Sequence, residues 1–271
     1  MSVIKNISPV GAGQEIKRLV LMMTHKSHTD HLGSALSISD ILAALYFKVL
    51  KINPKNHLDP KRDRFILSKG HGASALYATL ALRGFYPLKE LERYRINKGR
   101  FHGHPCHEAA PGIEVSTGSL GHGLSIGAGI ALALKQKNNP ARVYVLLGDG
   151  ECQEGSIWEA AMFCVSNKLN SVIPIIDVNG WQGFGSTQNI HPGNLAKRWR
   201  GFGWQVLTCD GHDVTALIKT LNQARRATKA TVVLAKTISG KGAPLIEDQL
   251  RAHYYILKED EYTETIKSYE K

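Results

Sequence analysis

The chain has 271 residues, of which 43% are hydrophobic and 7% aromatic, with 26 glycines and 10 prolines. This composition is typical of a globular protein with one large or two small domains, and it excludes a largely disordered chain. The 34 basic and 23 acidic residues leave a formal charge of +11, which favours anionic partners. Because the basic residues form no dense run, we expect a basic surface with phosphate-binding positions and no nucleic-acid partner.

Cysteine usage and hydropathy bear on the compartment. The four cysteines form no CxxC pair, which favours free thiols and a reducing compartment. The N-terminal residues lack a signal-like apolar region, and no stretch approaches the ~20 apolar residues that span a bilayer. We therefore expect a cytoplasmic protein with no membrane partner.

The first third of the chain predicts helices around one strand. Residues 14–24 have helical spacing, and a second helix is expected up to Val49 with Ser39 or Asp40 as its N-cap. Residues 64–68 predict a buried strand, followed by Lys69-Gly-His-Gly72 and an alanine-rich helix over 73–82. Residues 96–123 predict a long loop rich in glycine, proline and histidine, and loops of that length are usually functional.

The rest of the chain alternates between the two kinds of element. Helices are expected over about 124–136, 156–167, 195–200 and 214–225 and after Asp260, and strands over 143–147, 172–176, 205–208 and 231–235. Trp158 and Met162 are four residues apart and are expected in the core. The alternation predicts one doubly wound α/β domain over residues 1–271, with a mostly parallel sheet and an irregular arm from about residue 240.

Polar turns follow two neighbouring apolar strands. The strand at 143–147 leads into Gly148-Asp149-Gly150-Glu151, and the strand at 172–176 leads into Asp177-Val-Asn179-Gly. In open α/β sheets, ligands bind at this carboxyl edge. Asp149, the Asn179 amide and the Trp181 carbonyl are oxygen ligands suited to Mg²⁺, while Gly148 and Gly150 let the backbone approach a bulky anion. These residues predict a magnesium-held diphosphate.

Gly148-Asp149-Gly150 with Asn179 resembles the thiamine diphosphate signature of the transketolase family. Further segments resemble transketolase motifs in the same order, namely residues 26–37, 67–77, 103–105, 116–121, 210–213 and 236–242. The resemblance covers nearly the whole chain and narrows to the N-terminal, diphosphate-binding half of transketolase. It implies the diphosphate-binding (PP-type) fold of thiamine enzymes and the first subunit of a split, two-chain transketolase.

The resemblance also implies residue roles. The metal, Mg²⁺ with Ca²⁺ or Mn²⁺ as substitutes, would be held by Asp149, Asn179 and Trp181. Thiamine diphosphate would be contacted by His71, Gly118, Ser119, Leu120, Gly148, Gly150, Glu151 and Asn179. The channel for sugar phosphate substrates would be lined by His31, His71, His104 and His253, because imidazoles exchange protons with hydroxyls near neutral pH.

The family places an activating glutamate on a pyrimidine-binding domain, and no glutamate here can be given that role. We therefore expect a C-terminal, pyrimidine-binding partner subunit in an α2β2 assembly. Three departures from the family pattern bear on substrate preference: Asp30 stands before His31 in place of glycine, Cys106 in place of an acidic residue, and His122 in place of glutamine.

Other interpretations of the sequence remain open. The chain could belong to another thiamine diphosphate enzyme, such as a 2-oxo acid dehydrogenase α chain or a specialised ketol transferase. It could also be a non-catalytic relative that binds the cofactor or only the partner. The cluster of His102, His104, Cys106 and His107 could be a structural zinc site, although its spacing differs from that of usual zinc ligands.

Overall fold

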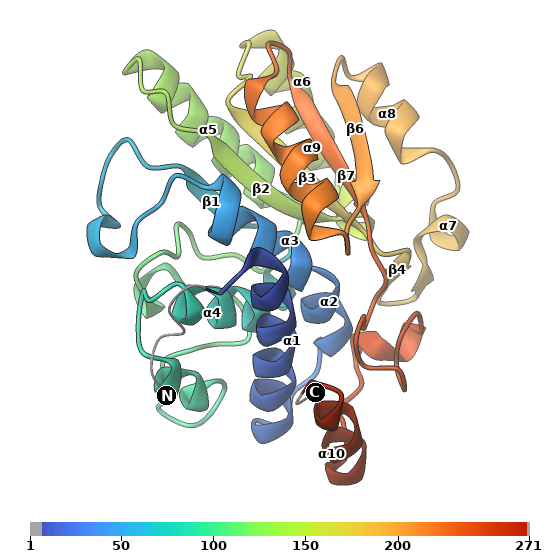
Figure 1. The fold of residues 1–271 in the computed structure, drawn as a ribbon. Coiled ribbons are helices and arrows are strands. Elements are labelled where there is room, and N and C mark those ends of the chain that lie inside the picture. The colour runs from blue at the N-terminus through green and yellow to red at the C-terminus, as the bar shows by residue number, and fades with distance from the viewer. Residues whose placement is uncertain (1–6, 270–271) are drawn as a thin grey trace.

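The computed structural model describes residues 7–269. Its helices are α1 (Pro9–Lys26), α2 (Leu32–Ser37), α3 (Ser39–Ala44), α4 (Ala73–Leu82), α5 (His122–Gln136), α6 (Gly155–Ser166), α7 (Thr187–Ile190), α8 (Leu195–Gly201), α9 (Val214–Arg226) and α10 (Glu259–Lys267). Its strands are β1 (Arg64–Leu67), β2 (Val143–Gly148), β3 (Val172–Val178), β4 (Trp181–Gln182), β5 (Gly185–Ser186), β6 (Gln205–Asp210) and β7 (Thr231–Lys236). Figure 1 shows their arrangement.

The main sheet has five parallel strands in the order β1-β2-β3-β7-β6. The register pairs Gly148 at the end of β2 with Asp177 near the end of β3, so the two polar turns lie side by side. Strand boundaries agree with the predicted ones to within two residues, because each of the central strands contains a short run of buried, mostly aliphatic residues.

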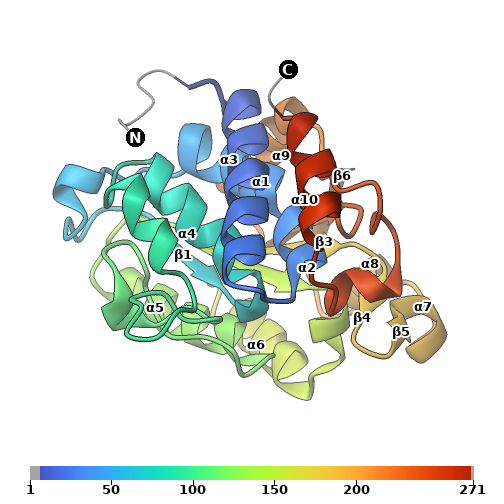
Figure 2. The same ribbon diagram turned by 90° about the horizontal axis from the view of Figure 1, so that it is seen from below.

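Helices cover both faces of this sheet (Figures 1 and 2). Helices α1 to α4 and α9 pack on one face, and α5, α6 and α8 pack on the other. Alternate residues of one strand serve the two layers: Tyr144 and Leu146 face the first, and Val143, Val145 and Leu147 face the second. The predicted α/β fold with a doubly covered parallel sheet is confirmed.

One segment of the described chain, Leu32–Val49, is apolar and long enough to pass a length-and-composition test for a membrane span. It consists of α2, α3 and a π-helical turn, and 89% of it is buried inside the protein. It packs against α1, α4 and α9, as the central helix of a protein core does.

The structure corrects two local predictions. Neither Ser39 nor Asp40 caps a helix: Ser39 Oγ donates to the Ala35 carbonyl, and Asp40 pairs with Lys17 and His212. Helical backbone already begins at Leu32, seven residues before the predicted cap, because the apolar segment from that point is buried on all sides. Met162 was expected in the core but is 49% exposed on α6, whereas Trp158 is partly buried against Trp199 and Phe202.

Candidate functional site

A cavity of about 440 Å³ opens at the carboxyl edge of the sheet, where β1, β2 and β3 end. It is lined by all of the residues that the sequence singled out except Ser119, namely His31, His71, His104, Gly118, Leu120, Gly148, Asp149, Gly150, Glu151, Asn179, Trp181 and His253. Ser119 is exposed between two lining residues. The roles given to these residues remain predictions, but the structure brings them to one place.

Asp149 joins the two polar turns. Its Oδ1 accepts the Gly150 N–H at 2.9 Å, and its Oδ2 accepts the Gly180 N–H at 2.8 Å and the Thr187 hydroxyl at 3.3 Å. Burial and the nearby negative charge of Asp177 raise the pKa of Asp149 to about 6, against the opposing effect of those N–H donors. A carboxylate in this setting is stabilised by a bound cation.

Asn179 is oriented by its own turn. Its Nδ2 donates to Asp177 Oδ2 at 2.9 Å, and its Oδ1 accepts the Trp181 N–H at 2.9 Å. The Trp181 ring is held in turn, since its Nε1 donates to Asp248 at 2.8 Å. Trp181 begins a short hairpin, β4 with β5, that was not predicted and that places Phe184 at its tip. An amide oxygen and a carboxylate from adjacent turns are thus available for one hard cation.

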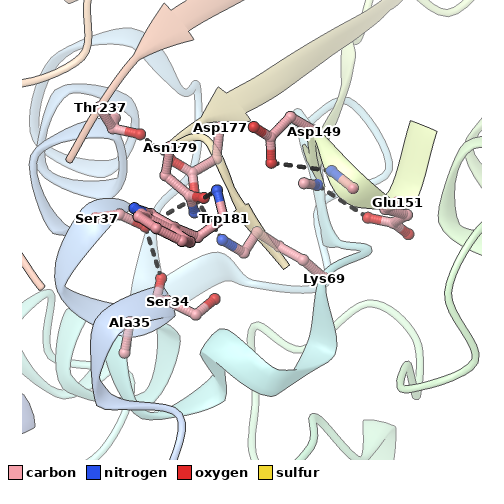
Figure 3. A network of polar contacts seen from close by, with 12 residues as sticks. Ser34, Ala35, Ser37, Lys69, Asp149, Glu151, Asp177, Asn179, Trp181 and Thr237 are labelled. Atoms are coloured by element: carbon pink, nitrogen blue, oxygen red, sulfur yellow. Dashed lines mark hydrogen bonds and ion pairs between the residues drawn. The ribbon is translucent and has the colours of Figure 1, made fainter. Parts of the chain in front are cut away.

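Beneath these turns lies an ion pair between Lys69 and Asp177, to which the sequence motifs assigned no role (Figure 3). The two side chains are 1% and 0% exposed. Asp177 also accepts hydrogen bonds from the Ser37 and Thr237 hydroxyls, so each of its oxygens is occupied. Lys69 and Asp177 lie inside segments that carry family motifs, but their pairing joins positions 108 apart and leaves no local signal.

Glu151 connects three segments around the cavity. Its Oε1 accepts the Gly121 N–H at 2.9 Å and the Ser68 hydroxyl at 2.5 Å, and its Oε2 accepts the Gly148 N–H at 3.0 Å. The side chain is buried, and burial raises its pKa despite these donors. The structure therefore shows Glu151 as a residue that ties the ends of β1 and β2 to the N-terminus of α5.

The four histidines of the cavity wall lie close to one another. The ring centroid of His31 is 5.5 Å from that of His71, 6.5 Å from that of His104 and 5.1 Å from that of His253. The backbone N–H of His31 also donates to the His253 carbonyl at 3.0 Å. His253, which had the loosest sequence match, therefore lies beside His31 and His71.

Three of these imidazoles are shifted toward the neutral form. Burial, the charge of Lys69 and the neighbouring rings hold the pKa of His71 well below its usual range. Burial and positive charge at His31 lower the pKa of His253 to about 4, and burial with the charges at His31 and Arg95 lowers the pKa of His104. Neutral imidazoles can accept protons from sugar hydroxyls.

The cavity fits a polar ligand with a bulky anionic group. Ser34 lines it, and Ser34 Oγ is buried without a hydrogen-bond partner among the described residues. Gly118 adopts φ +147°, a conformation that disfavours other residues, and a Cβ on Gly70 would lie 2.9 Å from the Gly118 nitrogen. The backbone there is thus close-packed, and Gly118 forms part of the cavity wall without a side chain. These features fit thiamine diphosphate with a divalent cation.

The structure gives no support to a zinc site. Across residues 7–269, no group of three or more His, Cys, Asp or Glu side chains is placed to hold a metal ion. His104 faces His31, and His107 Nδ1 is 2.8 Å from the Ile113 carbonyl. The set of Asp149, Asn179 and a backbone carbonyl is of a different kind, with a single carboxylate.

Comparison with known proteins identifies the fold and the family. The family described as "Transketolase, thiamine diphosphate binding domain" matches residues 11–270. The chain is 42% identical to the 6-deoxy-6-sulfo-D-fructose transketolase subunit SqwG of Clostridium sp. (strain MSTE9), with 94% of each chain covered. It is 39% identical to one of the apulose-4-phosphate transketolase subunits of Actinobacillus succinogenes, with 90% of this chain and 89% of the relative covered.

Solved structures agree with this result. Transketolase from Campylobacter jejuni superposes with a TM-score of 0.90 at 32% identity, covering 98% of this chain and 43% of that chain. Transketolase from Pichia stipitis, solved with sedoheptulose 7-phosphate, has a TM-score of 0.90 at 30% identity, covering 97% and 41%. The chain thus spans about two fifths of the solved transketolases that it matches. It belongs to the transketolase family, in which it corresponds to the N-terminal, thiamine diphosphate-binding part of the enzyme.

Proposed function

We propose that this chain is the thiamine diphosphate- and Mg²⁺-binding subunit of a two-chain transketolase, which transfers a two-carbon ketol unit from a ketose phosphate to an aldose phosphate. The observation that carries the proposal is the cavity that joins the Asp149 and Asn179 turns to four histidines. The relatives named as subunits match the chain along almost their full length, which supports a separate partner.

In this proposal, Asp149, Asn179 and the Trp181 carbonyl hold Mg²⁺, for which Ca²⁺ or Mn²⁺ can substitute. Gly148, Gly150, Gly118, Ser119 and Leu120 let the backbone contact the cofactor, with His71 beside it, and Glu151 fixes the segments that carry them. Thiamine diphosphate, when bound, supplies the carbanion chemistry by which the ketose carbon–carbon bond is cleaved and re-formed.

The protein's own part is to bind and orient the sugar and to exchange protons with it. His71, His104 and His253 have lowered pKa values, so at neutral pH they are uncharged and can accept protons from sugar hydroxyls. Imidazole N–H groups at the cavity rim can also donate hydrogen bonds to a developing alkoxide.

We propose that the partner is a C-terminal, pyrimidine-binding subunit in an α2β2 assembly, with sugar phosphates as substrates and a cytoplasmic location. Exposed apolar residues beside the cavity support a docking surface there: Phe184 is 94% exposed and Tyr254 is 56% exposed. The cavity is therefore flanked by apolar surface that a partner would bury.

A specialised ketol transferase is the second candidate. The two subunit relatives carry names that specify 6-deoxy-6-sulfo-D-fructose and apulose 4-phosphate, at 42% and 39% identity, whereas human transketolase is 37% identical. Asp30 and Cys106 near the histidines also differ from the family pattern. A donor panel of xylulose 5-phosphate, 6-deoxy-6-sulfofructose and apulose 4-phosphate, with ribose 5-phosphate as acceptor, separates the two candidates.

The test of the proposal combines reconstitution with cofactor binding. The product of the neighbouring open reading frame is co-expressed and ketol transfer is measured; we expect activity with both chains and none with this chain alone. Robust transfer by the single chain would contradict the two-chain proposal. Asp149→Ala should abolish Mg²⁺-dependent binding of thiamine diphosphate, measured by calorimetry, while circular dichroism stays unchanged. Unchanged cofactor affinity would refute the metal assignment.

A further inference from the structure

Asp30 forms a bridge at the rim of the histidine-lined cavity. Its Oδ1 lies 2.9 Å from His31 Nδ1 and 3.0 Å from Arg95 Nη1. The Asp30 and His31 side chains are 31% and 25% exposed, so the bridge is partly screened from solvent. One carboxylate oxygen thus joins a cavity histidine to a cation on another loop.

Arg95 is held firmly enough to act as an anchor. Its backbone adopts φ +49°, and its N–H donates to the Phe101 carbonyl at 2.8 Å. The aliphatic part of its side chain lies over Gly103, where an added Cβ would be 3.4 Å from Arg95 Cδ. The guanidinium therefore comes from a loop that is fixed to the segment carrying His104.

His31 differs from the other cavity histidines in having a carboxylate partner. His71 and His253 lie 5.5 Å apart and face His31, but neither has a carboxylate within hydrogen-bonding distance among the described residues. Four imidazoles this close together cannot all be charged, because like charges repel. Several other titratable or charged groups surround His31. Asp30 and Arg95 form the bridge, and Lys69 and His71 come from the segment after β1. The remaining groups are His104 from the loop before α5, His253 from the turn η7 (Leu250–His253), and Tyr254, which follows that turn.

We propose that Asp30, anchored by Arg95, is a positioning residue that accepts the Nδ1–H of His31 and thereby holds this ring in one tautomer and one orientation. His31 then directs Nε2 toward the oxygen of a bound sugar. This inference rests on the proposed function for its catalytic consequence, but its structural part concerns the cofactor-free chain alone.

The electrostatics of the neighbouring groups agree with this arrangement. Partial burial acts to raise the pKa of Asp30, but the hydrogen bond and positive charge of His31, together with the hydrogen bond from Arg95, hold it below its usual value. Asp30 is therefore ionised at neutral pH and can accept the Nδ1–H of His31. Positive charge at His31 in turn contributes to the lowered pKa of His104 and His253.

The first experiment identifies the His31 tautomer in the isolated, cofactor-free chain by ¹⁵N NMR. The His31 signals are assigned by their loss in His31→Asn. The bridge requires a hydrogen on Nδ1, because a carboxylate accepts hydrogen bonds and cannot donate them. Asp30→Gly, which removes the acceptor, should therefore shift the His31 signals toward the Nε2–H tautomer. Asp30→Asn, which keeps a neutral acceptor oxygen, should shift them less. Unchanged His31 signals in both variants would overturn the proposal.

A matched control is available elsewhere in the chain. His25 Nε2 lies 3.0 Å from Glu259 Oε2, a second carboxylate–histidine pair that does not line the cavity. Glu259→Gln should leave the His31 signals in place. If Glu259→Gln shifted them as strongly as Asp30→Gly does, the effect would reflect net charge, and the local bridge would be refuted.

The second experiment uses the reconstituted two-chain enzyme. If the bridge holds His31 in place for proton exchange with the sugar, its loss should affect the chemical step more than substrate binding. Asp30→Gly should therefore lower kcat by roughly 10-fold, a part of what a positioned acid or base contributes, with little change in KM. Arg95→Gln, which leaves the carboxylate in place, should lower kcat less. A change confined to KM, or an unchanged kcat, would overturn the catalytic part of the inference.

The two experiments separate this inference from the proposed function. If the NMR shift occurs and no ketol transfer is found with any partner or donor, the proposed function fails and the Asp30–His31 bridge stands. If ketol transfer is found and the His31 NMR signals do not respond to substitution of Asp30, the proposed function stands and the bridge fails.

Discussion

Lys69 and Asp177 form an ion pair that is almost completely excluded from solvent, directly beneath the turns that carry Asp149 and Asn179. Removing one partner leaves an uncompensated charge in the interior. Asp177→Ala should therefore lower the free energy of unfolding by about 3–5 kcal/mol, measured by urea denaturation of the purified chain. The double variant Lys69→Met/Asp177→Leu should recover part of this loss, because it leaves no buried charge.

Glu92→Gln is the matched control for that measurement. Glu92 pairs with Lys26 at 3.5 Å, with side chains 60% and 58% exposed. Surface pairs contribute about 0–1 kcal/mol, so this variant should be nearly neutral. If Asp177→Ala were as mild as Glu92→Gln, the ion pair would not be the structural support that its burial indicates.

Glu151→Gln should lower the stability of the chain and its affinity for thiamine diphosphate. The amide can present only one acceptor oxygen, so the N–H of either Gly148 or Gly121 would face an NH₂ group. An unsatisfied buried donor costs about 1–3 kcal/mol, and we expect a loss of that size together with weaker thiamine diphosphate binding. Glu92→Gln, at an exposed pair with Lys26, should change neither. Calorimetric titration and urea unfolding test both effects, and wild-type behaviour of Glu151→Gln would argue against the connection.

The stability of the chain should fall as pH decreases from about 6.5 to about 4, in part because of His253. Burial lowers its pKa to about 4 in the folded protein, whereas its usual value is 6.5. Between these values the unfolded chain binds a proton that the folded chain does not, so acid favours unfolding. After allowance for solvent screening, we expect about 1 kcal/mol from this residue.

The measurement is the urea midpoint of wild type and His253→Gln over this range of pH. The variant should lose less stability than wild type as pH falls. Asp149, with its pKa raised to about 6, acts in the opposite direction, and the comparison of variant with wild type removes that shared effect. Parallel curves for the two proteins would show that His253 does not titrate as its burial requires.

His212 should hold the segment that follows β7. Its Nδ1 is 2.9 Å from Asp40 Oδ2, and its Nε2 accepts the Ile238 N–H at 2.9 Å. His212→Ala should speed hydrogen exchange at the Ile238 amide and lower stability by about 1–3 kcal/mol, because Asp40 and Ile238 each lose a partner. His57→Ala, in the loop before β1, should leave that amide unchanged. Equal hydrogen-exchange rates at the Ile238 amide in His212→Ala and wild type would contradict this role of His212.

Phe184→Ser should impair assembly with the partner chain and leave the isolated chain as stable as wild type. Phe184 lines the cavity mouth and is 94% exposed. Aromatic residues buried at interfaces often contribute about 2 kcal/mol to the binding free energy. We therefore expect the dissociation constant, measured by calorimetry, to increase about 30-fold. Leu58→Ser, at a residue 79% exposed on a distant loop, is the control. Equal affinities for both variants would remove Phe184 from the docking surface.

The sequence predicted the central strands and the position of the site well, because both depend on local patterns. Runs such as Val143–Leu147 are apolar and end in polar turns, and parallel strands bring those turns to one edge. The pairing of Lys69 with Asp177 was missed because nothing in either segment specifies a partner 108 positions away. Met162 was misplaced because four-residue spacing from Trp158 fits a buried face and an exposed edge of α6 equally.

The N-cap error at Ser39 and Asp40 has a similar cause. Both residues are good caps, but the chain is already helical from Leu32. Ser39 Oγ donates to the Ala35 carbonyl one turn earlier, and the Asp40 carboxylate pairs with Lys17 from α1. The β4–β5 hairpin was missed because its strands have two residues each, too few for an alternating pattern. The bridge from Asp30 to Arg95 likewise depends on a loop conformation, with φ +49° at Arg95, that composition does not predict.

The backbone of His31 lies in the left-handed region, with φ +66° and ψ +20°, at the point where α2 begins. Alanine is disfavoured there, by roughly 1–2 kcal/mol, whereas asparagine tolerates this conformation. An alanine scan would therefore assign to His31 a defect that combines lost imidazole chemistry with a distorted first turn of α2. Asparagine substitution measures the chemistry alone, and the difference between His31→Ala and His31→Asn gives the contribution of the chain path to the shape of the substrate channel.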